Sequence, residues 1–498
     1  MTDNILPYFS SLKSALADLA SGRGTAFGTK TQADITTRLL DCMYVRETDA
    51  KRLQANCFAA LLRLLPEAEL LLKTPGEHTS ARGPENLSDS LRELQAICET
   101  QNFSAFDRFL HLCSKLQGSL MLYSTPAAST LRRAIIDIDR RYCAEFEAAV
   151  DVRFEASKKK DAAPSSSIRN TRQYDEKALL AFIRSAFPKE GDVEIRSSGF
   201  ISGGTSKFTM LITLNNARSL PAEIVLRGDA TGMFGGAPVS YEYRLIKAVY
   251  ENGGCVPKPL AVESSGSVFG APFMLLEKRS GVSIGHMQNL PRTPNPPLCA
   301  DIAAKLAALH LIPVSTFGTW INGADVSSSA WALRWIEEGY RNWATCEMPS
   351  TVFSTAFDWL RRHAPINDRA PRTLVHGDYG LNNLLVEGSA VTAILDWEFS
   401  HLGNPAYDLG YFRCMAEPLS SWEHFLAAYE SAGGPLPDKS QLDYATIFAS
   451  TRLGVMTTQV TRAFLSGAET GLVGAMVVGG NFYEMMVNRI GDALDRVL

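Results

Sequence analysis

The residues with the clearest chemical potential lie between positions 374 and 398. Asp378 is followed five residues later by Asn383 in LVHGDYGLNN, and Asp396 follows in AILDWE. Phosphoryl transfer needs a carboxylate that orients the acceptor hydroxyl and takes its proton, and oxygen ligands that hold Mg²⁺. Asp378 suits the first task, and Asn383 and Asp396 suit the second. The pattern therefore predicts a metal-dependent phosphoryl-transfer site.

The segments around these residues are expected to bring them together. Residues 384–386 and 391–395 have the composition of two strands, and the turn Glu387-Gly388-Ser389 separates them. Such a hairpin would return Asp396 to the side of Asn383. The spacing H-x-D-x-x-x-x-N, which begins at His376, is also that of kinase catalytic loops. Either segment alone is a weak signal, but both at this spacing favour a kinase-like site.

The elements that must position this site are a small β-rich region and a larger helical one. A helix is expected at 240–250, and residues from 301 onward are mainly helical. The expected strands are 193–200, 208–214, 223–226 and 272–277. A β-rich lobe followed by a helical lobe indicates an α+β, protein-kinase-like two-lobed fold.

The chain divides at a charged, Ser/Pro-rich stretch of linker composition. Residues 1–155 have helical periodicity and are expected to form an all-α domain, followed by a linker at 156–175, an N-lobe at 176–280 and a C-lobe at 281–498. A fragment that begins near Ser165 is expected to fold by itself, because the linker carries little apolar surface. The N-terminal helices could contact a partner or substrate, or form a stabilising cap or dimerisation element.

Composition excludes several other classes of protein. The 498 residues are 46% hydrophobic and 20% charged, with a net charge of −4, which favours a soluble protein without nucleic-acid binding. The N-terminus lacks the pattern of a signal peptide, and the apolar run 471–480 is too short to span a bilayer. The nine cysteines lack CxxC spacing, so disulfides and zinc are not expected. A cytoplasmic protein that does not bind membranes is predicted.

The segments HGDYGLNNLLV and AILDWEFSHLGNPAYDLGYF resemble the aminoglycoside phosphotransferase and choline kinase superfamily, over about residues 190–498. The resemblance is greatest to the branch that includes kinase-like domains linked to acyl-CoA dehydrogenases. It implies that Asp378 is the catalytic base and that Asn383 and Asp396 are the metal ligands. It also implies that His376 orients the loop and that Asp408 is a buried aspartate that braces it.

The same resemblance assigns nucleotide contacts in the N-lobe. Arg227 stands where kinases carry a strand lysine, and it would pair with Glu242; a surface ion pair is the alternative. Glu277 would lie beside the adenine, while Glu398 could assist metal or water binding or simply lie at the surface. The turn that would cover the phosphates is formed by Ser202, Gly203, Gly204, Thr205 and Ser206.

Together these features predict an enzyme that uses ATP and Mg²⁺ to phosphorylate a hydroxyl of a small molecule. The C-terminal helices, roughly 415–498, are expected to wall the acceptor site. Residues 444–468 and 471–483 contain no Asp or Glu, while Arg452 and Arg462 are present. A phenolic compound or a hydroxyacyl-CoA is therefore favoured over an aminoglycoside. The alternative is a catalytically inactive, kinase-like scaffold, but the intact set Asp378, Asn383 and Asp396 favours activity.

Overall fold

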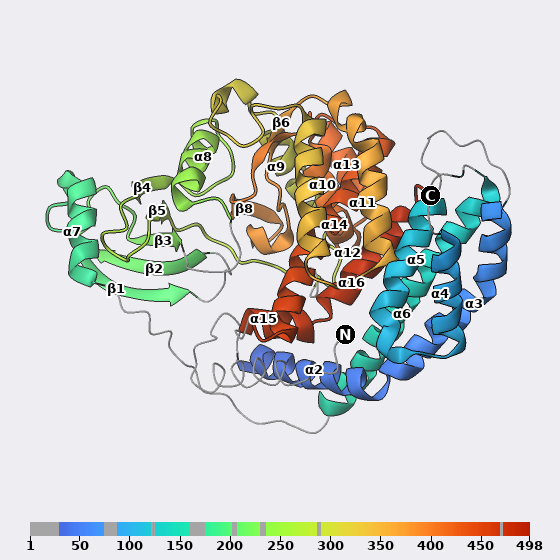
Figure 1. The fold of residues 1–498 in the computed structure, drawn as a ribbon. Helices are drawn as coiled ribbons and strands as arrows, with labels where there is room; N and C mark the ends of the chain where they lie inside the picture. Colours follow the sequence, from blue (N-terminus) through green and yellow to red (C-terminus); the bar gives the residue numbers. More distant parts are fainter. Residues whose placement is uncertain are drawn as a thin grey trace.

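The computed structural model describes residues 29–73, 87–120, 123, 125–158, 175–201, 207–229, 236–285, 290–468 and 472–498. A five-stranded sheet forms one lobe, a mainly helical region forms a second, and further helices flank the second lobe (Figure 1). The predicted α+β, two-lobed kinase-like fold with preceding helices is confirmed. Every described helix falls short of the length and apolarity needed to cross a membrane.

The first lobe is an antiparallel sheet with two accompanying helices. Its strands are β1 (Glu194–Ile201), β2 (Lys207–Asn215), β3 (Glu223–Asp229), β4 (Pro259–Glu263) and β5 (Phe273–Glu277). The helices are α7 (Glu176–Ala186) and α8 (Val239–Glu251). The strand order is β1-β2-β3-β5-β4. Strand β4 and helix α7 are absent from the prediction, although Asp175 caps α7 by accepting hydrogen bonds from its first turn.

The alternation of side chains along each strand sends them to two different cores. Phe273 and Leu275 pack in the cluster that includes α7, whereas Met274 and Leu276 pack in the cluster that includes α8. Arg227 of β3 lies opposite Met274 in the strand register, so it shares the α8 face. This face is the one turned toward the helical lobe, and the strand thereby places a cation between the lobes.

The second lobe is mainly helical and carries two small two-stranded sheets. Strand β6 (Thr373–Val375) pairs with β9 (His401–Gly403), and β7 (Leu384–Glu387) pairs with β8 (Ala390–Ile394). The β7–β8 hairpin is the one that the sequence predicts. The helices are α9 (Pro296–His310), α10 (Ser328–Ala344), α11 (Thr351–His363), α12 (Ala406–Leu419), α13 (Trp422–Ser431), α14 (Lys439–Leu465), α15 (Leu472–Gly479) and α16 (Phe482–Leu494).

The N-terminal helices pack on the helical lobe, away from the sheet (Figure 1). They are α2 (Thr29–Thr48), α3 (Ala50–Lys73), α4 (Leu87–Glu99), α5 (Phe106–Leu120) and α6 (Pro126–Lys158). Helix α2 contacts α15, α5 contacts α11, and α6 contacts α16. Buried side chains of both parts, such as Phe109, Phe146, Phe353 and Ile490, belong to one continuous apolar core.

Polar contacts, one of them buried, cross the same boundary. Asp139 of α6 is 2% exposed and accepts a hydrogen bond of 2.5 Å from Ser350, the residue that caps α11. Arg140 of α6 forms ion pairs with Asp492 and Asp495 near the end of α16. The shared core and these contacts favour the role of a stabilising cap for the N-terminal helices. Because of this packing, we now expect that a fragment beginning near Ser165 does not fold by itself.

Candidate active site

The backbone of the predicted catalytic loop is held by Asp408 of α12. Its buried carboxylate accepts hydrogen bonds from the backbone nitrogens of His376 at 2.7 Å and Gly377 at 2.8 Å. The Nε2 atom of His310 lies 3.1 Å from the same carboxylate. Burial opposes the charged form, but the hydrogen bond from His310 and nearby charges hold the pKa of Asp408 below its ordinary value. Asp408 is therefore the buried brace that the sequence predicts.

The loop makes a tight turn at Gly377. His376, the residue before it, links the loop to the segment that follows β8. Gly377 has a φ of 81°, and a Cβ atom there would lie 2.5 Å from the carbonyl oxygen of Phe399. The Nδ1 atom of His376 accepts a hydrogen bond from the Asp378 nitrogen at 3.2 Å, so Nε2 carries the proton and donates to the Leu395 carbonyl at 2.9 Å. Burial lowers the pKa of His376. The neutral ring thus links the loop to the segment that carries Asp396.

Asp378 and Asn383 lie side by side. The Asn383 amide donates to the Asp378 carboxylate at 2.7 Å and to its backbone carbonyl at 2.9 Å. Burial raises the pKa of Asp378 to about 7, although the hydrogen bond from Tyr411 and the charge of Arg452 act in the opposite direction. A carboxylate in this state exchanges a proton at neutral pH.

A partly buried ion-pair network joins the two lobes at Asp396. The Nε atom of Arg227 lies 3.2 Å from Glu242 Oε2, and its Nη2 group binds the Asp396 carboxylate. Glu242 is fully buried, and its Oε1 atom has no hydrogen-bond partner within the described part of the chain. Burial raises the pKa of Glu242 to about 7, while Arg227 acts against this. The predicted Arg227–Glu242 pair is present; Glu242 is buried and Arg227 is 16% exposed, so the pair does not lie on the surface.

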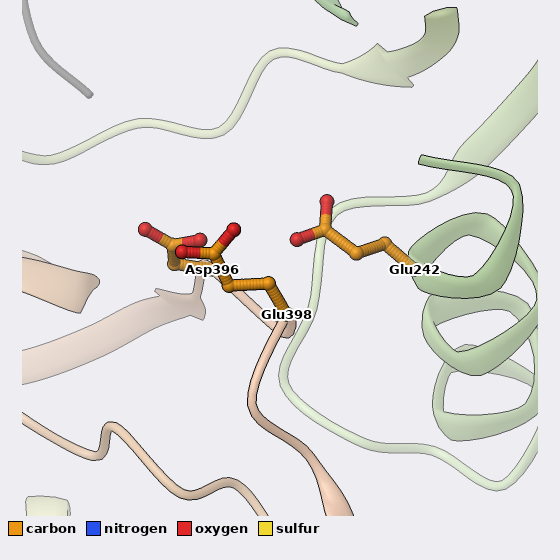
Figure 2. A group of neighbouring side chains, drawn as sticks. All are labelled: Glu242, Asp396 and Glu398. Carbon is orange, nitrogen blue, oxygen red and sulfur yellow. The ribbon is translucent and has the colours of Figure 1, made fainter. Parts of the chain in front are cut away.

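Glu398 completes a group of three carboxylates. Ligand oxygens of Glu242, Asp396 and Glu398 all lie within 4.8 Å of one another, and Figure 2 shows the three side chains converging from α8 and the loop after β8. Glu398 is 8% exposed, and Lys207 of β2 approaches it at 4.0 Å. Arg227 binds Glu242 and Asp396 and so offsets the repulsion between these oxygens. Three clustered carboxylates also supply the oxygen ligands of a divalent cation, so the group is a candidate metal site, and Glu398 is not a surface residue.

The structure describes only some of the other residues that were predicted to contact the nucleotide. Glu277 ends β5, and its backbone nitrogen donates to the Lys258 carbonyl at 2.9 Å. The chain then crosses to the helical lobe, where Arg279 binds the Thr392 carbonyl at 3.0 Å. Glu277 thus lies at the start of the interlobe connection. The predicted phosphate-covering residues lie outside the described residues: Ser202, Gly203, Gly204, Thr205 and Ser206.

Three residues of the site were not identified from the sequence, and Arg452 was noted only for its charge in the expected acceptor wall. His310 bridges Tyr429 and the Asp408 brace. Arg452 donates to the Gly377 carbonyl at 2.6 Å, and Lys207 reaches the acid group from β2. Tyr411 could have been found, because it follows Asp408 by three residues on α12 and so shares its face.

Two of the helices expected to wall the acceptor site have different neighbours. Helix α15 (Leu472–Gly479) packs against both α2 and α14, and Cys42 of α2 lies beside the Val478 carbonyl. Helix α14 reaches the catalytic loop through Arg452. The role of these helices at the acceptor stays a prediction.

Comparisons with known proteins agree with this geometry. The phosphotransferase enzyme family model matches residues 222–444. Mouse acyl-CoA dehydrogenase family member 10 is 30% identical over 213 residues, which are 40% of this chain and 19% of the relative. The probable acyl-CoA dehydrogenase IBR3 of Arabidopsis thaliana is 27% identical over 288 residues, 54% of this chain and 34% of the relative. The chain thus spans about a fifth to a third of these relatives.

A solved structure supports the fold itself. A protein of Ralstonia eutropha, described as a candidate aminoglycoside phosphotransferase, superimposes with a TM-score of 0.51 and 21% identity. The match covers 65% of this chain and 99% of that protein. The two lobes therefore have the fold of a phosphotransferase, as predicted, and the N-terminal helices are an addition to it.

Proposed function

Since residues 222–444 belong to the phosphotransferase enzyme family, we propose that the protein transfers a phosphoryl group from Mg·ATP to a hydroxyl of a small molecule. The observation that carries this proposal is the Asp378 carboxylate, which lies 2.7 Å from the Asn383 amide and has a pKa of about 7. A general base works best when its pKa lies near the working pH. The position and the pKa of Asp378 suit this role.

Asn383 and Asp396 are the proposed metal ligands. The Leu395 nitrogen donates to the Asn383 carbonyl at 2.8 Å, which keeps the two segments together. Carboxylate and amide oxygens are suitable donors for Mg²⁺, and the unpaired Oε1 of Glu242 adds a buried acceptor to the same region. When bound, the ion neutralises charge on the phosphates and helps to align them. We assign Glu398 to the same metal region.

Arg227 is the proposed phosphate ligand of the N-lobe. Its guanidinium contacts both Glu242 and Asp396, and Glu242 can keep it in place when Asp396 turns to a metal. A guanidinium binds phosphate oxygens through two parallel N–H donors. Ser202, Gly203, Gly204, Thr205 and Ser206 are proposed to cover the phosphates, and Glu277 marks the adenine side.

In the proposed reaction Asp378 takes the proton of the acceptor hydroxyl. The acceptor oxygen forms a bond to the γ-phosphorus while the bond from that phosphorus to the bridging oxygen breaks, and ADP leaves. Asn383 and Tyr411 hold the Asp378 carboxylate in position throughout. His376 orients the loop and stays neutral.

A phenolic compound or a hydroxyacyl-CoA-like alcohol is the proposed acceptor, in preference to an aminoglycoside. The cationic Arg452 lies close enough to Asp378 to affect its pKa, and its guanidinium stacks on the Phe399 ring at 4.3 Å. A polycationic acceptor would be repelled at this position, because like charges are costly where water is excluded. A cytoplasmic location remains part of the proposal.

The second candidate function is an inactive scaffold whose N-terminal helices bind a partner or self-associate. ADP release with a panel of phenols, hydroxyacyl-CoA esters, simple alcohols and aminoglycosides separates the two. We expect turnover by the wild type, and a loss of roughly a hundredfold or more in Asp378→Asn with ATP binding retained. Nucleotide binding without turnover on any acceptor would favour the scaffold, and equal turnover in Asp378→Asn would remove Asp378 from the mechanism.

A further inference from the structure

The hydroxyl of Tyr241 joins the two lobes beside the group of three carboxylates. Tyr241 precedes Glu242 in the first turn of α8, and its hydroxyl donates a hydrogen bond of 3.0 Å to the Ser400 carbonyl of the helical lobe. The same oxygen accepts a hydrogen bond of 3.2 Å from the backbone nitrogen of Asn322, in the connection between α9 and α10. One side chain of the N-lobe thus contacts two backbone segments of the helical lobe.

The two segments that Tyr241 contacts adjoin the proposed metal ligands. Ser400 follows Glu398 by two residues, on the loop between β8 and β9. The Asn322 carbonyl accepts a hydrogen bond of 2.8 Å from the Leu402 nitrogen of β9, the strand that follows Ser400. Tyr241 is therefore bonded to the loop that carries the carboxylates, both directly and through its neighbour.

Trp320 packs against the same face of α8 from the helical lobe. Its half-buried indole makes a T-shaped contact with the Tyr241 ring, with 5.8 Å between the ring centroids. The guanidinium of Arg244 lies 4.1 Å from the centroid of the same indole. Residues three apart share a face of a helix, so this face of α8 rests on the tryptophan. These contacts orient the Tyr241 ring toward the helical lobe.

A second contact holds the start of α8 on the same loop. The nitrogen of Ala237, two residues before α8, donates to the Glu398 carbonyl at 3.3 Å, and the Lys207 ammonium donates to the Ala237 carbonyl at 2.6 Å. A helix held only at its end can still turn about its axis, whereas a further contact along the helix prevents this. Successive residues point about 100° apart around a helix. Fixing Tyr241 therefore also fixes the direction of Glu242.

We propose that Tyr241 is an interlobe positioning residue that sets the affinity of the site for its divalent cation. Its hydroxyl keeps α8, with Glu242, beside the loop that carries Asp396 and Glu398 (Figure 2). Mg²⁺ requires nearly ideal octahedral geometry, so a small separation of the carboxylates of the two lobes weakens its binding. The inference rests on the proposed function, and it deepens it by naming the contact that holds the two halves of the metal site together.

Cation binding tests this role without catalysis. Mn²⁺ is titrated into the full chain with a non-hydrolysable ATP analogue, and the free ion is followed by electron paramagnetic resonance against the analogue alone. We expect Tyr241→Phe, which removes only the hydroxyl, to bind Mn²⁺ about three- to tenfold more weakly, as the loss of one hydrogen bond implies. Tyr250→Phe, at an exposed tyrosine of the same helix, is the matched control and should keep the wild-type affinity.

Hydrogen exchange of the metal-free protein tests the effect on the helix itself. The backbone amides of residues 243–250 should exchange about three- to tenfold faster in Tyr241→Phe than in the wild type or in Tyr250→Phe. Equal Mn²⁺ affinity in the wild type and Tyr241→Phe would overturn the proposal, even with a lower Tm, because the contact would then only stabilise the fold. A wild type that binds no Mn²⁺ with the analogue would count against the proposed function itself, and with it this inference.

Discussion

The pKa of Asp378 leads to a specific pH dependence of catalysis. Burial raises this pKa from 3.8 to about 7. Because the base must be ionised, kcat/KM should rise with pH and level off above the folded pKa. A carboxyl group with a pKa of about 7 is ionised to about 10% at pH 6 and about 90% at pH 8, so kcat/KM should rise roughly ninefold over this range.

The assay is steady-state ADP release at constant ionic strength from pH 5 to 9. A profile already flat from pH 5 upward, as an ordinary aspartate would give, would refute the reasoning. Tyr411→Phe removes a hydrogen bond that lowers the pKa of Asp378, so the rise should move to higher pH. Tyr340→Phe, at an exposed tyrosine of α10, is the control and should keep the wild-type profile.

Stability provides an independent check of the same pKa. Since the folded pKa of Asp378 is raised, the folded state binds more protons than the unfolded state between about pH 4 and pH 7. Stability should therefore fall as pH rises through this window. Asp378→Asn removes the buried charge, and its Tm at pH 8 should be higher than that of the wild type. A lower Tm at pH 8 would mean that the carboxylate is not destabilised by its surroundings.

Other substitutions test the rest of the site. Asp396→Ala should abolish phosphoryl transfer, because Mg²⁺ is held by few protein carboxylates; full wild-type activity in excess EDTA would contradict the metal assignment. Arg227→Ala should raise the KM for ATP about tenfold or more through the loss of phosphate contacts, whereas unchanged kinetics would make it only a structural ion-pair residue. A fragment beginning near Ser165 should aggregate, because the faces of α11, α15 and α16 would be exposed; a monodisperse fragment with cooperative unfolding would show that the lobes fold alone.

The local parts of the site could be predicted from the sequence. Asn383 and Asp396 are joined by a short hairpin, so their spacing was enough to place them together. The Arg227–Glu242 pair was implied by the family resemblance, which places Arg227 where kinases carry a strand lysine and Glu242 as its partner on the next helix. In both pairs, strands and helices close together in the sequence fix the relative positions of the two residues. Their catalytic roles remain predictions.

The contacts that cross the fold could not be predicted. His310 and Asp408 are separated by 98 residues, and no periodicity shows that α9 brings one to the other. The linker composition at 156–175 suggested independent parts, but composition does not report the packing of Phe109 or Phe146 against the helical lobe. The packing of α15 on α2 was likewise not predicted, because burial against a helix and burial around a ligand select the same residue types.

The contact of Arg227 with Asp396 also sets an order of events in time. The guanidinium covers the carboxylate that we propose as a metal ligand, so in the proposed mechanism the ion pair has to open before the metal and nucleotide are fully seated. Opening is a first-order step. The observed rate constant for Mg·ATP binding, followed by stopped-flow tryptophan fluorescence, should therefore level off as the nucleotide concentration rises. In Arg227→Ala the step is absent, and the same rate constant should keep rising in proportion to concentration even where the final affinity is lower.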